Sequence, residues 1–461
     1  MKNGVASVGS VSQQLAQWIA ALNPADVPHD VRRAVADTVI DTIGLSIASA
    51  NTDYGVAVRK GAVGNGDCTV FGTDEKRDAF CAAMINGTTG HGEDYDNTYE
   101  GCPVHSGVVI VPALIAAGEA YGLATDRVAL GMAVGIEVMC RLGGAAKKGV
   151  HTAGFHPTSV LGTVGAAAGV SAALGHDARQ IRDAMGVAGS MASGIIEYLA
   201  DGTWTKRLHP GWAAQSGLWA AALGGSGFAG PAAVFEGKHG LFSSFAPSIK
   251  PDYDELVDGL GHRWEAARVA FKPYACGTMT QPYIDCAVHL ANIGVTPDQI
   301  EEVVCKVGEG TVHRLWEPVD VKQNPPTAYA AKFSGHYCVA AGFVFGDAGL
   351  AQFTEETIRD PRILKLAAKV RHVVDPENEY PANYTGHVAV RLTDGTWVEA
   401  NQLQLRGGMR QPMSRHEIKA KCRANLSFGG WPADHADKME IAADALFSET
   451  APFSVAAFGQ T

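Results

Sequence analysis

Two long stretches of this 461-residue chain contain no Asp, Glu, Lys or Arg. They run over residues 149–176 and 208–235, and both are rich in Ala and Gly. A segment without charge and with few bulky side chains is typical of a helix packed tightly among other helices, and the pattern Leu161-Gly-Thr-Val-Gly-Ala-Ala-Ala-Gly allows such close approach. Because Gly, Pro, Ser and His interrupt both stretches, we expect buried helices of a soluble protein rather than membrane spans.

The composition narrows the class of protein further. A formal net charge of −11 argues against nucleic acid or an anionic membrane as a partner. Charged residues make up only 18% of the chain, which suggests a large core or a subunit interface. The nine cysteines are scattered without a C-x-x-C spacing, so neither a disulfide framework nor a structural zinc site is expected. The first residues lack the apolar core of a signal peptide, and we therefore expect a cytoplasmic protein.

The first half of the chain has a helical pattern. Apolar residues occupy every fourth position from Val31 to Ile47, which is the spacing of one helix face. Thr125 and Asp177 are predicted as helix N-caps, and Gln180 completes a capping box with Asp177. Strands do not alternate with helices in this half, which argues against a dinucleotide-binding fold.

The pattern changes near Ala270. Residues 302–307 alternate as in a strand, and residues 388–398 indicate a hairpin with its turn at Asp394-Gly395. Between them, residues 354–370 resemble a helix that begins with a Thr cap and an acidic first turn. Ser414 and Glu417 form a capping box at the start of a further helix.

These patterns predict a mainly α protein with an α+β second domain. Residues 1–268 form the first part of a large helical domain, residues 269–402 form a smaller α+β domain, and residues 403–461 return to the helical domain.

The segment from Glu197 to Trp212 holds the most informative charges. Lys206, Arg207 and His209 lie between two tryptophans and directly before the second uncharged stretch. Buried cations need compensating anions, and a ligand carboxylate or phosphate is a natural candidate. The alternative is a pair of surface cations at a helix end.

A second cluster concentrates acids, a hydroxyl and imidazoles between two helical patterns. It reads His91-Gly-Glu-Asp-Tyr-Asp-Asn-Thr98 and is followed by His105. The segment Asp94-x-Asp96-x-Thr98 matches the DxDxT motif of haloacid-dehalogenase phosphatases, but the hydrophobic strand that precedes that motif is missing here. An EF-hand does not fit either, because position 12 of the loop counted from Asp94 is His105 rather than Glu. Acids that cap a helix N-terminus remain an alternative. So does a divalent metal on His91, Glu93, Asp94 and Asp96, although we expect no metal.

Two shorter segments add candidate residues. His156 lies in Gly154-Phe-His-Pro-Thr158 at the start of a helix, where a satisfied core histidine is the alternative. Lys272 lies at the junction into the second domain, where a surface lysine is the alternative. No P-loop or G-x-S-x-G occurs, and the G-x-G-x-x-G match at residues 225–230 follows a helical pattern, so it is interpreted as a helix-ending loop.

Together these segments resemble the MmgE/PrpD family, which includes 2-methylcitrate dehydratases, cis-aconitate decarboxylases and iminodisuccinate epimerase. The resemblance covers nearly the whole chain. Its most specific pieces are the Asp94–His105 block, residues 154–158, Ala192-Ser-Gly-x-x-Glu197 through Trp212, Val234-Phe-Glu-Gly237, Lys272-Pro-Tyr, Ala331-Lys-Phe-Ser-Gly-His-Tyr337 and Asp360-Pro-Arg-Ile.

The resemblance implies a large helical domain closed by a smaller α+β lid, a homodimer, and an active site in the cleft between the domains. Neither an organic cofactor nor a catalytic metal is implied. Carried over by position, the catalytic residues are Asp94, Thr98, His105, Lys206, Lys272 and Tyr337, and the substrate-binding residues are His156, Arg207, His209 and Gln281.

The chain departs from the family at two places. Many relatives carry a histidine shortly after the junction lysine, whereas this chain has Cys276-Gly-Thr-Met-Thr-Gln281. Ser106 follows His105 where proline is common. The missing histidine is expected to act in decarboxylating relatives, so its absence disfavours cis-aconitate as the substrate.

We therefore expect a cofactor-independent lyase that acts on a small di- or tricarboxylate by proton abstraction and loss of water. His105 is the general acid/base candidate, the two lysines stabilise developing negative charge, Asp94 orients an imidazole or acts as a base, and Tyr337 completes the site. The alternatives are epimerisation of a substituted succinate, then decarboxylation of a cis-aconitate type of acid, and, as a different class, a non-catalytic binder of organic acids.

Overall fold

The computed structural model describes residues 9–458 and divides the chain into two compact units. The first unit contains the residues up to Gly92, residues 96–269, and the residues from Ile418 onward. The second contains residues 93–95 and 270–417. The C-terminal return therefore begins further along the chain than the residue 403 that the sequence suggests.

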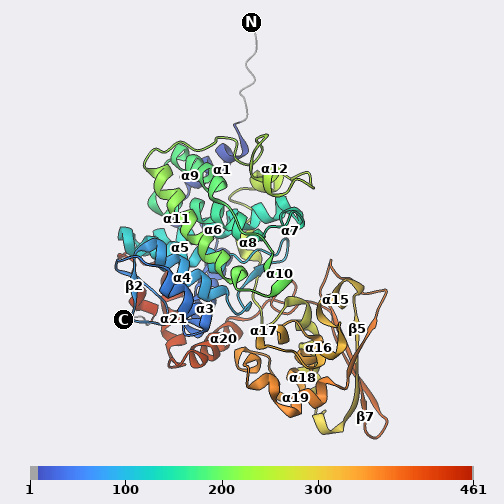
Figure 1. The fold of residues 1–461 in the computed structure, drawn as a ribbon. Helices are drawn as coiled ribbons and strands as arrows, with labels where there is room; N and C mark the ends of the chain where they lie inside the picture. The colour runs from blue at the N-terminus through green and yellow to red at the C-terminus, as the bar shows by residue number, and fades with distance from the viewer. Residues whose placement is uncertain (1–8, 459–461) are drawn as a thin grey trace. The chain divides into compact units, whose positions relative to one another are not determined.

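The first unit is built almost entirely of helices, and its central helix is α8 (Figure 1). Helices α5, α6, α9 and α11 all pack against α8. Its helices are α1 Val11–Ala21, α2 His29–Ser49, α3 Asp53–Gly61, α4 Ala79–His91, α5 Gly107–Tyr121, α6 Thr125–Ala146, α7 Gly149–Thr152, α8 Pro157–Leu174, α9 Ala178–Met191, α10 Tyr198–Asp201, α11 Thr205–Gly225, α12 Leu241–Phe245, α13 Asp254–Val257, α20 Arg415–Phe428 and α21 His435–Ala445. Its short strands are β1 Cys68–Thr69, β2 Lys76–Arg77 and β3 Thr98–Tyr99.

Glycines let these helices approach closely. A Cβ on Gly169 of α8 would lie 2.5 Å from the carbonyl oxygen of Gly131 on α6, and a Cβ on Gly165 would lie 2.9 Å from that of Gly135. Real side chains do not tolerate such distances, so these positions require glycine. The close helix packing predicted from residues 161–169 is confirmed.

The first uncharged stretch forms a buried helix, as predicted, because α8 is buried over almost its whole length. The prediction for the second stretch is confirmed in part: α11 is buried on one face, with Trp212 and Trp219 exposed, and residues 226–233 form a largely exposed loop. By length and apolar composition, α6 and α8 could cross a membrane, but 94% of the apolar window of each is buried within the protein. Burial of this extent is what a core helix shows.

The predicted helix caps are confirmed in part. Asp177 and Gln180 form the capping box at the start of α9. The prediction for Thr125 is wrong: Ala124 is the N-cap of α6, and the Thr125 hydroxyl instead donates to the carbonyl of Ala451. The C-terminal segment therefore takes the hydrogen bond that would have capped the helix.

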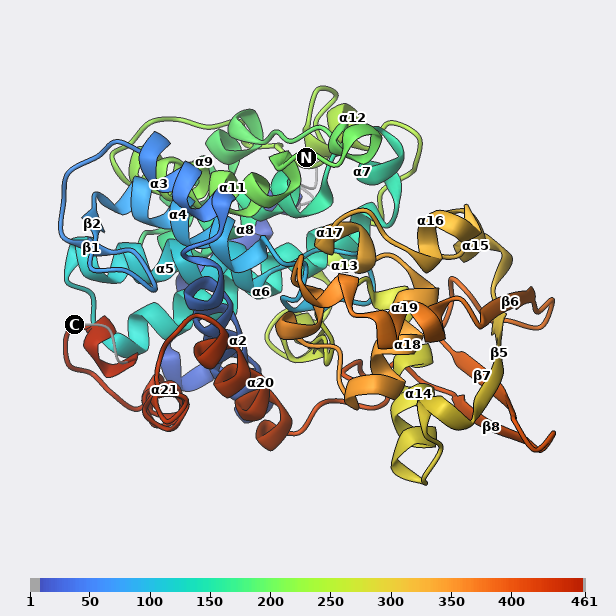
Figure 2. The same ribbon diagram turned by 60° about the horizontal axis from the view of Figure 1, so that its bottom comes forward.

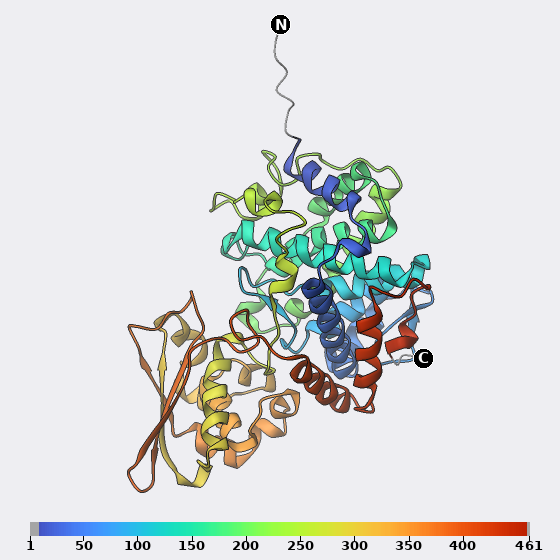
Figure 3. The same ribbon diagram turned by 180° about the vertical axis from the view of Figure 1, so that it is seen from behind.

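The C-terminal helices pack on the first unit beside α2 (Figure 3). Ser414 and Glu417 make the predicted capping box at the start of α20. A buried ion pair joins α20 to α2, with the Lys421 Nζ atom 2.7 Å from the Asp41 carboxylate. The chain thus ends in the unit in which it began.

The second unit is a four-stranded sheet with helices on one side (Figure 2). Its strands are β5 Ile300–Val307, β6 Val370–Val374, β7 Gly386–Leu392 and β8 Trp397–Gln402, and β4 Val269–Ala270 lies at the boundary. The strand order is β6-β5-β7-β8, in which β5 and β6 are parallel and the other pairs antiparallel. The helices are α14 Gln281–Asn292, α15 Val312–Leu315, α16 Val319–Gln323, α17 Ala328–Ala331, α18 Gly335–Phe345 and α19 Pro361–Ala367. Of these, α14 contacts β7 and β8, and α18 contacts α14 and β6.

Most of the predicted elements of this unit are confirmed, and with them the fold class. The strand at 302–307 lies within β5, and the hairpin turns at Gly395, whose φ of +87° suits glycine. The single helix over 354–370 is wrong. Pro361 has no backbone N–H to continue a preceding helix, so the chain forms a short 3₁₀ turn at Thr357–Arg359, begins α19 with Asp360 as its cap, and enters β6 at Val370.

Candidate active site

Four histidines and one aspartate gather in the interior of the first unit. His91 is the last residue of α4, and Asp96 lies in the loop that follows. His105 directly precedes the N-cap of α5, His156 is the N-cap of α8, and His209 lies in α11. All five residues are buried. The site is therefore built from four separate helices that meet at one place.

Glycines also bring two of these helices together. The α-carbons of Gly87 on α4 and Gly211 on α11 face each other so closely that a Cβ on Gly87 would lie 2.7 Å from the Gly211 Cα atom. His91 lies four residues after Gly87 on α4, and His209 lies on α11, so the helices that carry these two histidines are in contact. Close helix packing is thus what assembles the imidazoles.

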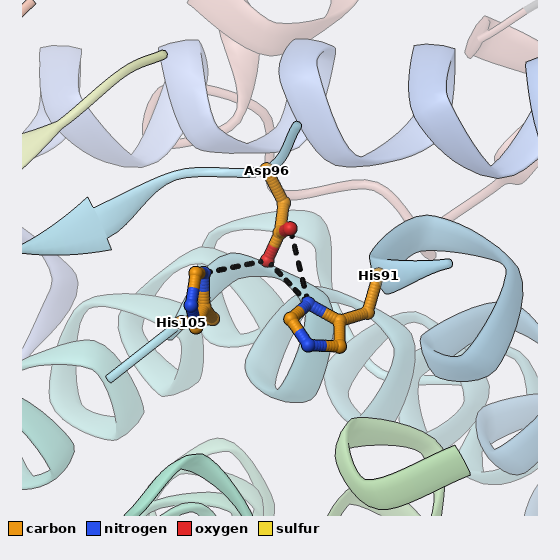
Figure 4. A group of neighbouring side chains, drawn as sticks. All are labelled: His91, Asp96 and His105. Carbon is orange, nitrogen blue, oxygen red and sulfur yellow. Dashed lines mark hydrogen bonds and ion pairs between the residues drawn. The ribbon is translucent and has the colours of Figure 1, made fainter. Parts of the chain in front are cut away.

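Asp96 binds two of the imidazoles (Figure 4). Both of its carboxylate oxygens lie 3.0 Å from Nδ1 of His91, and one of them lies 3.1 Å from Nδ1 of His105. His105 Nδ1 also lies 3.0 Å from the carbonyl oxygen of Asn97. The carboxylate is therefore held between two ring nitrogens.

These contacts determine where the His105 ring carries its proton. A carbonyl oxygen and an ionised carboxylate accept hydrogen bonds but cannot donate them. The ring nitrogen that faces both must therefore be the donor. His105 is then the Nδ1–H tautomer when neutral, and its Nε2 carries a lone pair. The backbone N–H of His105 donates to the Thr158 hydroxyl at 3.1 Å, which fixes the residue further. Such a histidine can act as a general base.

The other two imidazoles bind each other. Nδ1 of His156 and Nδ1 of His209 lie 3.1 Å apart, so one ring donates and the other accepts. The rings of His91 and His156 have centroids 5.8 Å apart, and the Tyr198 ring packs on both His156 and His209 at 6.1 Å and 5.8 Å. The four histidines thus form one continuous group.

Burial and neighbouring charges set the protonation of this group. The pKa of His91 and that of His209 are lowered to about 4, chiefly by burial and in smaller part by the positive charge of Lys206. The pKa of His156 is lowered well below its usual value by burial and then by His91 and Lys206. Burial alone would raise the pKa of Asp96, but its contacts with His91 and His105 hold it well below its usual value. Near pH 7 the site therefore contains an ionised carboxylate and neutral imidazoles at these three positions.

The two cations predicted beside this group occupy the first turn of α11. Lys206 is half-buried, and it lies one helical turn before His209, so the two residues share a face of the helix. The Arg207 guanidinium lies over the ring of Tyr54, 4.3 Å from its centroid. Arg207, predicted as a substrate-binding residue, therefore makes a cation–π contact with Tyr54.

The second unit holds the other lysine together with Asp94. The Lys272 Nζ atom donates to the Asp94 carboxylate at 2.9 Å and to its backbone carbonyl at 2.7 Å, and both side chains are buried. Asp94 has a φ of +54°, in the left-handed region that few residues other than glycine adopt. The sequence suggested Asp94 as the carboxylate that orients an imidazole, but the residue that makes these contacts is Asp96.

The remaining predicted site residues have structural partners in their own units. Tyr337 on α18 is fully buried, and its hydroxyl donates to the carbonyl of Gln352 at 2.5 Å. Gln281 is the first residue of α14 and donates to the carbonyl of Cys276 at 3.3 Å. Thr98 is buried at the start of β3. None of these contacts by itself assigns a chemical role.

The donor atoms of His91, Asp96 and His105 lie within 4.8 Å of one another, the only such group of His, Cys, Asp or Glu side chains within residues 9–458. By position alone, these three side chains could surround a metal ion. The His105 Nδ1 atom faces the Asn97 carbonyl and carries the proton of the neutral ring, so only its Nε2 atom could coordinate a metal. Contacts of both Nδ1 atoms with Asp96 already join the three side chains.

Sequence reasoning did not assign His91 and Asp96 to the site. Both belong to the block from His91 to Thr98 that the sequence singled out, so the signal was the density of acids and imidazoles there. Choosing between Asp94 and Asp96 needed the backbone conformation.

Comparisons with known proteins match the whole architecture. The MmgE/PrpD N-terminal domain model matches residues 13–254, and the MmgE/PrpD C-terminal domain model matches residues 274–447. The human cis-aconitate decarboxylase is 29% identical over 440 residues, which is 91% of this chain and 88% of that protein. The mouse cis-aconitate decarboxylase is 28% identical over 444 residues (91% and 87%), and the cis-aconitate decarboxylase-like protein oryM of Aspergillus oryzae is 26% identical over 444 residues (90% of each).

Proposed function

This chain belongs to the MmgE/PrpD family, and we propose that it is a cofactor-independent lyase that removes water from a small di- or tricarboxylate by abstracting a proton next to a carboxylate. One observation carries the proposal. The Nδ1 atom of His105 faces two acceptors, so in the neutral ring the Nε2 atom carries the lone pair. The positive charge of Lys206 acts on the three other imidazoles of the same group. A base and a cation in one group of side chains are what this reaction requires.

The reaction follows from that geometry. His105 Nε2 takes the proton from the carbon next to a carboxylate, and the electron pair of the broken C–H bond forms the new C=C bond. The C–O bond to the hydroxyl on the adjacent carbon breaks, and the departing oxygen takes the proton from the His105 imidazolium, so that one water is released and the neutral imidazole is restored. Asp96 stabilises the imidazolium that forms on His105, because its carboxylate already binds the Nδ1–H.

Lys206 stabilises negative charge in the proposed reaction. As the proton leaves, charge builds on the carboxylate next to the carbanion, and the ammonium of Lys206 offsets it. Lys272 belongs to the second unit, where Asp94 compensates its charge at 2.9 Å. The neutral imidazoles of His156 and His209 then supply hydrogen bonds without adding charge.

Decarboxylation is the second candidate, because the human and mouse relatives are named cis-aconitate decarboxylases. When CO₂ leaves, the carbanion must receive a proton, and the donor must carry one on the atom that faces the substrate. His105 offers a lone pair at Nε2 in its neutral form, which suits abstraction better than donation. The stretch Cys276–Gln281, without a histidine, supplies no imidazole donor either.

Incubation in D₂O, followed by proton NMR, tests the proposal. The panel contains 2-methylcitrate, citrate, cis-aconitate and substituted succinates. An alkene signal with loss of the hydroxylated acid is expected. Release of CO₂ from cis-aconitate would favour the second candidate, and deuterium entering an unchanged carbon skeleton would indicate an epimerase. No reaction of any acid with the folded protein would contradict the lyase assignment.

A further inference from the structure

The Nε2 atom of His91 is buried without a hydrogen-bond partner among residues 9–458. The His91 side chain is completely inaccessible to solvent. Its Nδ1 atom is engaged by both oxygens of Asp96, and its Nε2 edge points away from that carboxylate (Figure 4). A buried polar atom without a partner is unfavourable, so its presence in a group of functional side chains needs an explanation.

The carboxylate determines what kind of atom this Nε2 is. An ionised Asp96 can only accept hydrogen bonds, so the His91 Nδ1 atom must carry the ring proton. Since the ring is neutral, Nε2 then has a lone pair and no hydrogen. It can accept a hydrogen bond from a hydroxyl, but it cannot bind an ionised carboxylate, because both would be acceptors.

The position of this acceptor relates it to the proposed reaction. The ring centroid of His91 lies 4.8 Å from that of His105 and 5.8 Å from that of His156. The charge of Lys206 also acts on His91. The unpartnered atom therefore lies in the same group as the proposed base and the proposed carboxylate-stabilising cation.

We propose that His91 recognises the hydroxyl group of the substrate through its Nε2 atom, and that Asp96 is the positioning residue that holds His91 in the accepting tautomer. This inference rests on the proposed function, whose substrate carries a hydroxyl as well as carboxylates, and it names the residue that recognises that hydroxyl. Asp96 thereby fixes the tautomer of two rings. In His105 the Nε2 atom is then the base, and in His91 the Nε2 atom is the acceptor for the hydroxyl.

Two acids of the same shape and charge test the first part. Citrate and propane-1,2,3-tricarboxylate carry the same three carboxylates, and only citrate has a hydroxyl. Isothermal titration calorimetry on the full chain needs no turnover. We expect citrate to bind roughly tenfold more tightly, which is about 1.4 kcal/mol, because the acid without a hydroxyl leaves the acceptor unpaired.

His91→Asn provides the matched variant. The amide nitrogen of Asn can replace Nδ1 as the donor to Asp96, whereas nothing replaces Nε2. We expect the preference for citrate to fall to about one, with little change in the affinity for the acid without a hydroxyl. Equal binding of both acids by the unmodified protein would overturn the inference, even if either acid is turned over. Failure of both acids to bind would overturn the proposed substrate class, and the inference with it.

The tautomer tests the part played by Asp96 in the absence of any ligand. In ¹⁵N-labelled protein, the couplings between ring nitrogens and ring protons show which nitrogen carries hydrogen. We expect Nδ1–H for His91 and His105. In Asp96→Leu no acceptor at position 96 faces the His91 Nδ1 atom, whereas His105 keeps the Asn97 carbonyl, so His91 is expected to lose its preference for Nδ1–H and His105 to retain it. A His91 ring that is Nε2–H in the unmodified protein, or that does not respond to Asp96→Leu, would contradict the assignment.

Discussion

Gly211→Ala tests whether close packing of α4 and α11 supports the site. A Cβ at this position would lie 2.6 Å from the Thr88 hydroxyl and closer still to the carbonyl oxygen of Met84. The Met84 oxygen belongs to the backbone of α4 and cannot rotate away, so the two helices must move apart. The change therefore disturbs the helix that ends at His91 and the helix that carries His209.

The magnitude follows from the kind of clash. Overpacking of a well-packed core costs about 1–3 kcal/mol, and a clash with helix backbone belongs at the upper end of that range. One kcal/mol shifts the melting temperature by roughly 2–4 °C in a domain of 150–250 residues, and less in a larger one. We therefore expect Gly211→Ala to lower the melting temperature by about 5 °C or more.

Thermal unfolding followed by circular dichroism measures this effect, and Gly144→Ala is its control. Gly144 also lies within a helix, α6, but a Cβ there would meet only Glu255, at 3.9 Å. Removing a helical glycine without a clash stabilises by roughly 0.5–1 kcal/mol, so the control should melt at the same temperature or slightly higher. A Gly211→Ala protein as stable as the control would refute the packing argument.

Two further predictions concern buried charges. Burial lowers the pKa of His91, His156 and His209 below the value of about 6.5 in the unfolded chain, so their contribution to stability is complete above that pH and is lost as the pH falls toward 4. The free energy of unfolding in urea should decrease by up to about 1.4 kcal/mol per pH unit for each histidine, and a flat profile between pH 6.5 and 5 would contradict this. Lys421→Met should lower that free energy by about 3–5 kcal/mol at pH 7, because it leaves the Asp41 charge buried and unpaired. Adding Asp41→Leu should recover most of the loss, and a single variant as stable as the unmodified protein would be inconsistent with a buried pair.

The parts of the fold that depend on local pattern could be predicted from the sequence. The stripe from Val31 to Ile47 lies in α2, and the alternation at 302–307 lies in β5, because burial of one face imposes these periods. The single helix predicted over 354–370 is wrong because the apolar pattern continues past Pro361. This proline has no backbone N–H, so it cannot continue a preceding helix and instead begins α19. Periodicity alone could not show that Val370 starts a strand, because that depends on pairing with Val303 of β5.

The site could be predicted only in part, for a different physical reason. The block from His91 to His105 indicated chemistry, but it contains two aspartates separated by a single residue. The left-handed backbone at Asp94 turns the chain between them, so that Asp94 binds Lys272 while Asp96 binds the imidazoles. Their roles depend on this conformation and on contacts with distant helices, neither of which a local pattern encodes.

The turnover of His105→Ala and Lys206→Ala tests the central claim most directly. Each variant is measured on the acid that the unmodified protein consumes, after its fold has been checked by thermal unfolding. The account predicts a loss of at least roughly a hundredfold in kcat for each, the range expected when a general base or a charge-stabilising cation is removed. Near-normal turnover in both folded variants would place the chemistry elsewhere in the protein and contradict the account.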